Sequence, residues 1–156
     1  MSVEVRRATP DDLERWDRHV ERSPAGGLFH QLSALEVQAA HTDTRLHPLI
    51  GHKGQEPVGV FPVFERTIGP RPAASVRTAF SPPPGIHVID CGPASLNLAK
   101  LKQRKAERRH ERFVAGAFEW IDEAIDPVYT HLRLPGAYPD TRPFAWNDCT
   151  VTPRHT

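Results

Sequence analysis

The spacing of hydrophobic residues predicts a helix near the start of this 156-residue chain. Thr9 is a residue type that caps helices, and Pro10 after it suits a first turn. Leu13, Trp16 and Val20 then recur on one helical face. The glycines and proline of 23–27 end this helix, and 28–41 form a second one, with Leu32, Leu35 and Ala39 at helical spacing.

A long helix is predicted over 98–125, late in the chain. Its hydrophobic positions step by four, three and four residues, which is typical of a face turned to a core; they are Val114, Phe118, Ile121 and Ile125. Before Phe113 this stripe gives way to charged residues. We therefore expect the first half of the helix to face solvent or a partner.

The remaining pattern predicts strands. Residues 46–52 and 58–65 flank the letters KGQE and form a hairpin with Gly54 in its turn, and Pro62 suggests that the second strand is an edge strand or carries a bulge. Four shorter strands are expected over 3–8, 76–80, 86–91 and 128–134. The order β-α-α-β-β-β-β-α-β predicts an α/β or α+β fold with helices packed on a mixed sheet.

Charge is distributed unevenly, although the net charge is only +1. Residues 100–112 contain seven Lys or Arg and two Glu. Two interpretations stay open. Glu107 and Glu111 could pair with arginines one turn away on a solvated helix face. Alternatively the segment binds phosphate groups of RNA or of a nucleotide-linked substrate, through Lys102, Arg104, Lys105, Arg108 and Arg109.

Several common site types have no counterpart in the sequence. It contains no G-x-x-x-x-G-K-[ST], no G-x-G-x-x-G and no G-x-S-x-G. Its nine histidines form no H-E-x-x-H, and its two cysteines form no C-x-x-C, so we expect no metal site. The letters RTIGPR begin like an acyl-CoA loop, but Pro70 and Pro72 remove the backbone N–H groups that such a loop needs. Any acyl donor site should therefore lie outside this chain.

The absence of a signal peptide and of a membrane-spanning run of about 18 apolar residues predicts a reduced, cytoplasmic protein. The end of the chain offers another candidate site. Arg142, Trp146 and Asn147 bring a guanidinium, an indole and an amide to one turn, which could bind a carboxylate or a sugar-like ligand. The alternative is a structural turn, with Phe144 and Trp146 in the core and Arg142 bonded to backbone carbonyls.

Four motifs, in this order, resemble the N-terminal half of FemAB-type acyltransferases of the GNAT-like superfamily, closest to members from salt-loving archaea. They are LFHQLSALEVQ, LHPLIGHKGQEPVGVFPVFE, FSPPPGIHVIDCGP and DTRPFAWNDCTVTPRHT. The resemblance implies one GNAT-like domain over 1–156 with a mixed, largely antiparallel sheet. It also implies that 139–156 form a turn and a strand that lead into a missing second half.

The function implied by this resemblance is transfer of an acetyl or aminoacyl group to an amine. This chain would be the acceptor-side half, inactive alone, with His30, Gln31, Arg142, Trp146 and Asn147 around a small-molecule or cell-envelope amine. The donor, acyl-CoA or aminoacyl-tRNA, would bind elsewhere, and the sequence indicates no catalytic residue and no cofactor on this chain. The alternative is a non-enzymatic or degenerate module that binds an anionic partner through the helix at 100–112.

Overall fold

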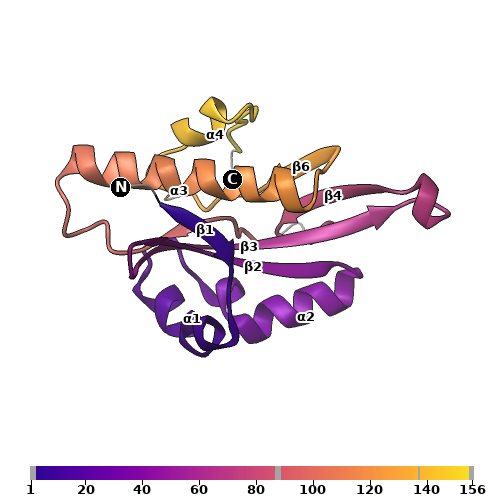
Figure 1. Cartoon of the computed structure of the whole chain (residues 1–156), viewed down its shortest axis with the longest axis horizontal. Helices are drawn as coiled ribbons and strands as arrows, with labels where there is room; N and C mark the ends of the chain where they lie inside the picture. The colour runs from indigo at the N-terminus through magenta and orange to yellow at the C-terminus, as the bar shows by residue number, and fades with distance from the viewer. Residues whose placement is uncertain (1–2, 87–88, 137, 155–156) are drawn as a thin grey trace.

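The computed structural model describes residues 3–86, 89–136 and 138–154. Its elements follow the predicted order as far as β6 (Figure 1). The strands are β1 (Glu4–Arg7), β2 (Arg45–Lys53), β3 (Glu56–Ile68), β4 (Val76–Ser81), β5 (Ala94–Ser95) and β6 (Tyr129–Leu132). The helices are α1 (Pro10–Arg22), α2 (Leu32–Thr42), α3 (Gln103–Ala124) and α4 (Arg142–Trp146), with short 3₁₀ turns η1 (Leu28–His30) and η2 (Pro72–Ala74).

The strands form one sheet in the order β1-β2-β3-β4-β6, and the short β5 pairs with β3. Every pairing is antiparallel except that of β4 with β6, which runs parallel from Thr78↔Tyr129 to Ser81↔Leu132. The predicted mixed, largely antiparallel sheet with packed helices is therefore confirmed.

Helix α1 begins as the sequence predicts. The Thr9 hydroxyl accepts a hydrogen bond from the Asp12 N–H, and the Asp12 carboxylate accepts one from the Thr9 N–H, at 2.8 Å. This reciprocal capping box satisfies two N–H groups that have no partner inside the helix. Trp16 and Val20 are buried on the inner face, as predicted.

The predicted hairpin is β2 and β3, joined by a turn at Gly54 and Gln55. Pro62 does not mark an edge strand, because β3 lies inside the sheet. On its second side, however, β3 pairs with β5 only at Gly59 and Val60, and with β4 only from Phe64 onward. Pro62 lies in the gap between these pairings, where a missing N–H leaves no strand partner unsatisfied.

Helices cover both faces of the sheet, α1 and α2 on one and α3 and α4 on the other (Figure 1). The core under α3 and α4 contains Leu49, Val58, Phe61, Val63, Ala79, Phe113, Val114, Ala117, Phe118, Ile121, Ile125 and Phe144. The core under α1 and α2 contains Trp16, Val20, Leu35, Ala39, Ile50, Val60, Phe64, Cys91, Ala94 and Leu96. The predicted hydrophobic stripe of the long helix is thus confirmed.

Three predicted boundaries are wrong. The described residues of 86–91 form no strand; after three consecutive prolines the chain rejoins the sheet only at β5, and residues 87 and 88 lie outside the described part. The long helix begins at Gln103 rather than at 98, because 98–101 close a separate turn. In 139–154 the structure has the short helix α4 and no strand, since backbone bonds from Asn147 and Cys149 return to Phe144.

The described helices are either too short or too polar to cross a membrane. Cys91 and Cys149 are free thiols. Cys91 is fully buried, and this burial raises the pKa of its thiol to about 12. A thiol in that environment is unreactive at neutral pH.

Candidate functional site

The carboxyl ends of the parallel strands β4 and β6 are the first place to look for a site, because ligands collect at such ends in sheets with parallel strands. The segments that leave these strands are tied together there. Arg133 N–H donates to the Ser81 carbonyl at 2.9 Å, and Cys91 N–H donates to the Arg133 carbonyl at 3.0 Å. Gly92 N–H donates to the Ser81 hydroxyl at 2.9 Å. All three N–H groups are therefore engaged within the protein.

His30 lies beside these ends, on the side of α1 and α2, and is 2% exposed. Gly27 N–H donates to His30 Nδ1 at 3.2 Å, so His30 Nε2 carries the proton and donates to the Gly92 carbonyl at 3.0 Å. Burial lowers the pKa of His30, which fits this neutral imidazole. Both ring nitrogens of His30 are hydrogen-bonded to the protein backbone, so His30 positions the loop at Gly92. Its neighbour Gln31 is half-buried and precedes α2.

A second buried histidine lies on the other face, under α3 and α4. His110 Nδ1 is 2.8 Å from the Ser95 hydroxyl, and His110 Nε2 is 3.1 Å from the Tyr138 hydroxyl. Burial lowers the pKa of His110 and raises that of Tyr138. This chain of hydrogen bonds joins β5, α3 and the segment after β6, and so fixes the approach to α4.

The surface next to this series of hydrogen bonds contains the guanidinium of Arg142. Two of its N–H groups donate to the Asp140 carboxylate, both at 2.9 Å, and its Nη2 lies 3.4 Å from Glu107 Oε1. The guanidinium carbon is 5.7 Å from the centre of the Trp146 ring. The hydrogen bonds from Arg142 hold the pKa of Asp140 below its usual range. Two carboxylates and an indole thus already contact one cation here, although the Arg142 side chain stays 56% exposed.

The five residues expected around an acceptor are not gathered in one pocket. His30 and Gln31 lie with α1 and α2, whereas Arg142, Trp146 and Asn147 lie with α4 on the other side of the sheet. The purely structural interpretation of the turn also fails in part. Arg142 bonds carboxylates rather than backbone carbonyls, and Trp146 is 58% exposed, although Phe144 is buried as expected. Asn147 donates to the Pro143 carbonyl at 2.7 Å.

The basic segment adjoins this surface. Glu107 does not pair with an arginine of its own helix; it accepts a hydrogen bond from Gln103 at 3.0 Å and lies against Arg142. Glu56 on β3 forms ion pairs with Lys100 and Arg109, and the side chain of Arg109 is 12% exposed. Four exposed cations of the segment have no carboxylate partner among the described residues: Lys102, Arg104, Lys105 and Arg108.

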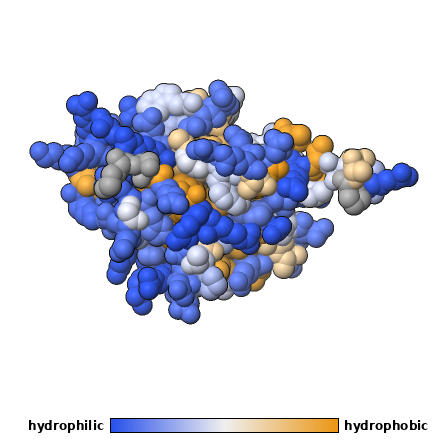
Figure 2. All heavy atoms as spheres, in the orientation of Figure 1, coloured by the Kyte–Doolittle hydropathy of each residue, from blue (hydrophilic) through white to orange (hydrophobic). Residues whose placement is uncertain are grey.

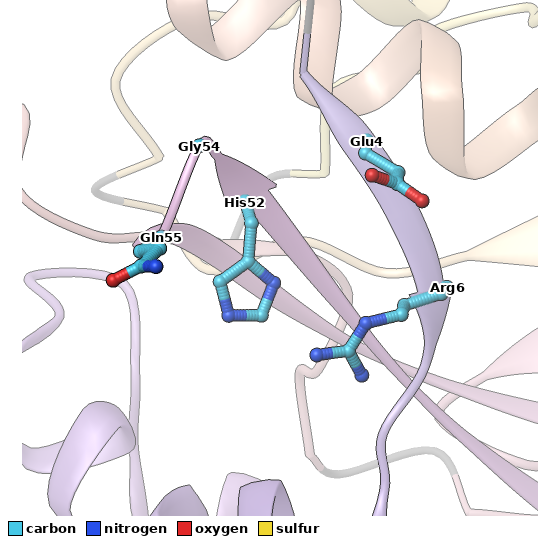
Figure 3. A pocket seen from close by; sticks show the side chains of 5 residues that line it. All are labelled: Glu4, Arg6, His52, Gly54 and Gln55. Atoms are coloured by element: carbon cyan, nitrogen blue, oxygen red, sulfur yellow. The ribbon is translucent and has the colours of Figure 1, made fainter.

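A hollow of about 270 Å³ lies elsewhere, at the opposite edge of the sheet (Figure 3). Glu4, Arg6, His52, Gly54 and Gln55 line it, and Arg6 and His52 point toward each other. Arg6 is already paired with a carboxylate of α1, and burial with the nearby guanidinium lowers the pKa of His52. The hollow is distant from the parallel strands and contains none of the predicted site residues.

Sequence reasoning missed Ser95, His110, Tyr138 and Asp140. One signal was available: His110 precedes Val114 by four residues and so continues the hydrophobic stripe of α3 into its charged half. Nothing in the sequence places Ser95 or Tyr138 next to it, because these contacts span 15 and 28 residues. The described residues contain no cluster of three potential metal ligands.

The sequence matches no protein-family model and no curated protein. The structure, however, resembles solved structures over nearly their whole length. A GNAT family acetyltransferase from Staphylococcus aureus has 11% identity and a TM-score of 0.53, with 100% of this chain and 98% of that chain covered. A ribosomal-protein-alanine N-acetyltransferase from Brucella melitensis has 10% identity and a TM-score of 0.54, with 99% and 96% covered.

A third similar structure is a transcriptional regulator from Bacillus halodurans, with 16% identity, a TM-score of 0.52, and 99% and 96% of the two chains covered. The fold is GNAT-like. Identities this low establish the fold alone, and the three proteins carry different names. Any activity must therefore be argued from the residues of this chain.

Proposed function

We propose that this chain takes part in transfer of an acyl group to an amine, and that it holds the amine acceptor. The observation that carries the proposal is the contact of the Arg142 guanidinium with Asp140, Glu107 and Trp146 on the surface. Carboxylates and an aromatic face are the groups that bind an organic ammonium. The GNAT-like fold supports the choice of reaction, because one structural neighbour is named as an acetyltransferase and another as a ribosomal-protein-alanine N-acetyltransferase.

The paired guanidinium changes the expected ligand. The sequence suggested that Arg142 would bind a carboxylate, but two carboxylates already neutralise it. A second anion gains little from a guanidinium in that state. A cationic acceptor instead competes with Arg142 for Asp140, Glu107 and the indole, so the arginine acts as an internal occupant of the site.

In this proposal the acyl donor, acyl-CoA or aminoacyl-tRNA, binds outside the described residues. The three backbone N–H groups at the ends of β4 and β6 are engaged by Ser81 and Arg133, which leaves them unable to hold a pyrophosphate or an oxyanion. A FemAB-type second half would supply the donor site. The role of this chain would be to position the amine, which is a large part of catalysis for such nucleophiles.

Calorimetric titration with a lysine-containing tetrapeptide and its Nε-acetylated counterpart tests the acceptor site. We expect the amine form to bind and the acetylated form to bind at least about tenfold more weakly, since only an ammonium satisfies the carboxylates. Trp146→Leu should weaken the amine form. Leu28→Ala, which alters another exposed hydrophobic residue in the turn η1 that contacts α2, should not. Equal binding of both peptides would disprove the acceptor site.

A parallel titration with acetyl-CoA tests whether this chain also binds the acyl donor. We expect no heat of binding with this chain, because the N–H groups described above are engaged. Tight binding of acetyl-CoA would support the acyltransferase class but overturn the assignment of this chain to the acceptor side alone. Binding of neither amine nor acetyl-CoA would remove the support for acyl transfer.

The four cations at the start of the basic segment that have no carboxylate partner among the described residues favour a second candidate function, an RNA-binding module. These cations are Lys102, Arg104, Lys105 and Arg108, and they stay exposed while Glu56 and Glu107 contact other partners. This observation weakens the interpretation of the segment as a self-paired, solvated face. A polyanion could take all four cations together, and its affinity would fall steeply with salt.

A further inference from the structure

A third buried histidine lies where the first three strands meet. His47 on β2 is 5% exposed, and its ring lies 5.3 Å from the ring of Trp120 on α3. Its Nδ1 lies 2.7 Å from Nη1 of Arg7 on β1, and its Nε2 lies 3.0 Å from a carboxylate oxygen of Glu65 on β3. One imidazole therefore joins β1, β2 and β3.

The partners of His47 fix its protonation state. A guanidinium can only donate hydrogen bonds, so Arg7 donates to Nδ1, and Nδ1 must carry no proton. The proton of the neutral ring is then on Nε2, which donates to the Glu65 carboxylate. Burial lowers the pKa of His47, in agreement with a neutral ring.

The groups around this imidazole act in opposite directions on an added proton. The Glu65 carboxylate favours the charged ring, and the Trp120 ring lies within the distance at which an indole attracts a cation. The charges of Arg7 and Arg45 oppose it. Arg77 on β4 lies 3.9 Å from the second oxygen of Glu65. Burial and two guanidinium groups thus hold the ring neutral against the pull of one carboxylate and one indole.

Arg7 and the added proton compete for the same nitrogen atom. A proton on Nδ1 would face an N–H group of Arg7, and neither group could accept a hydrogen bond from the other. The contact with Arg7 must therefore break when the imidazole is charged, whereas the contact with Glu65 becomes stronger. Arg7 is exposed and ends β1, which lies in front of the other strands in Figure 1, and hydrophilic residues cover much of this side of the molecule in Figure 2. Its side chain can therefore turn into solvent.

We propose that Arg7 and His47 form a pH-sensitive latch at the end of β1. In the closed state, neutral His47 accepts a hydrogen bond from Arg7, whose Nη2 also donates to the Leu46 carbonyl at 3.2 Å. One proton from solvent binds Nδ1 and opens the latch, and the imidazolium keeps its carboxylate partner. Next along the chain, Ala8 N–H donates to the Pro48 carbonyl at 2.8 Å, and this bond loses support when Arg7 leaves. The latch thus makes the attachment of β1 depend on pH.

Nitrogen NMR of the imidazole tests the closed state. At about pH 8 we expect the proton of His47 on Nε2, and a proton on Nδ1 instead would overturn the proposal. Arg7→Met removes the donor and should raise the pKa of His47. Arg45→Met is the matched control; it removes a guanidinium that acts on His47 through its charge, so it should raise that pKa less. Equal effects of the two changes would show that the contact with Arg7 does not control the proton.

Signals of Arg7 and Ala8 report the opening of the latch. As the pH falls through the pKa of His47, the Nε signal of Arg7 should shift with the same midpoint, and the protection of the Ala8 amide against hydrogen exchange should fall several-fold. His47→Asn keeps an acceptor oxygen near the position of Nδ1 and cannot be protonated, so both signals should lose this pH dependence. Constant Arg7 or Ala8 signals in the unmodified chain, or an unchanged pH dependence in the Asn variant, would overturn the proposal.

Discussion

Arg142 Nη2 lies 3.4 Å from Glu107 Oε1, and this contact joins the short helix α4 to the charged half of α3. The two segments are separate candidate sites in the sequence but form one surface in the structure. Asp140 and Trp146 complete the ring around the same guanidinium. The signs of the charges on this surface, rather than the presence of an arginine, would determine which ligand it could accept.

Replacing Arg142 distinguishes a cation site from an anion site. Arg142→Gln removes the internal cation, so we expect a lysine-containing peptide to bind several-fold more tightly and the pKa of Asp140 to rise toward its usual value. A carboxylate site would lose binding with the same change. Titration calorimetry gives the affinity, and NMR titration of the Asp140 carboxyl gives the pKa. Weaker peptide binding by a folded variant would contradict the cation site.

Gly59 allows α3 to pack closely on the sheet. An added Cβ would lie 2.2 Å from the ring of Phe113, a core residue that is 1% exposed. Gly59→Ala should therefore lower the free energy of unfolding by about 2 kcal/mol. Gly27→Ala is the matched control, because a Cβ there meets nothing within 4 Å. Urea denaturation measures both, and an equal effect of the two changes would argue against this contact.

The capping box of α1 predicts a difference between two threonines. Thr9→Ala removes the side chain that accepts from Asp12 N–H and should cost about 1 kcal/mol of unfolding free energy. Thr141 precedes α4 but makes no side-chain cap bond, so Thr141→Ala should cost less than about 0.5 kcal/mol. Thermal or urea unfolding of the two variants tests this, and the reverse order would contradict the assigned cap.

Two of the buried histidines, His30 and His110, predict that the chain loses stability in mild acid. Burial lowers the pKa of His30 and His110, so below about pH 6.5 the unfolded chain binds protons that the folded chain does not. The free energy of unfolding should then fall with pH by up to about 1.4 kcal/mol per unit for each histidine. Carboxylates contribute mainly below about pH 4.5, outside this window.

His110→Gln should reduce the slope of the unfolding free energy against pH, between pH 6.5 and 5, by the contribution of one histidine. His41 is exposed near the end of α2, and His41→Gln serves as the matched control that keeps the original slope. Urea denaturation at several pH values gives these slopes. An unchanged slope in the His110 variant would show that this imidazole does not resist protonation.

The RNA-binding candidate predicts a particular salt dependence. Filter binding of a single-stranded RNA at several salt concentrations should give a slope that Lys102→Gln/Arg104→Gln/Arg108→Gln reduces by up to about 2. A matched triple variant on α1 removes the same charge; it is Arg15→Gln/Arg18→Gln/Arg22→Gln. It should leave the slope unchanged if α3 is the contact. Equal effects would indicate non-specific attraction, and no binding by the unmodified chain would eliminate this function.

Much of the fold could be predicted because its signals are local. The cap at Thr9, the turn at Gly54 and the stripe from Val114 to Ile125 each depend on residues close in sequence. The strand expected at 86–91 fails because pairing depends on where β3 has a free side, which lies opposite Ala94 and Ser95. Only part of the candidate site was predicted from the sequence. Arg142 and Trp146 were named as candidate residues, but Asp140, His110 and Tyr138 were not.

The sequence by itself determined the order of elements, the two hydrophobic faces and the concentration of positive charge in one helix, since periodicity and composition encode these directly. Only the tertiary structure decided that β4 and β6 run parallel, that His30 and Arg142 lie on opposite sides of the sheet, and that Glu107 contacts Arg142 of α4. These depend on contacts between distant residues. Pairing and burial of the whole chain select those contacts, and no short stretch of sequence specifies them.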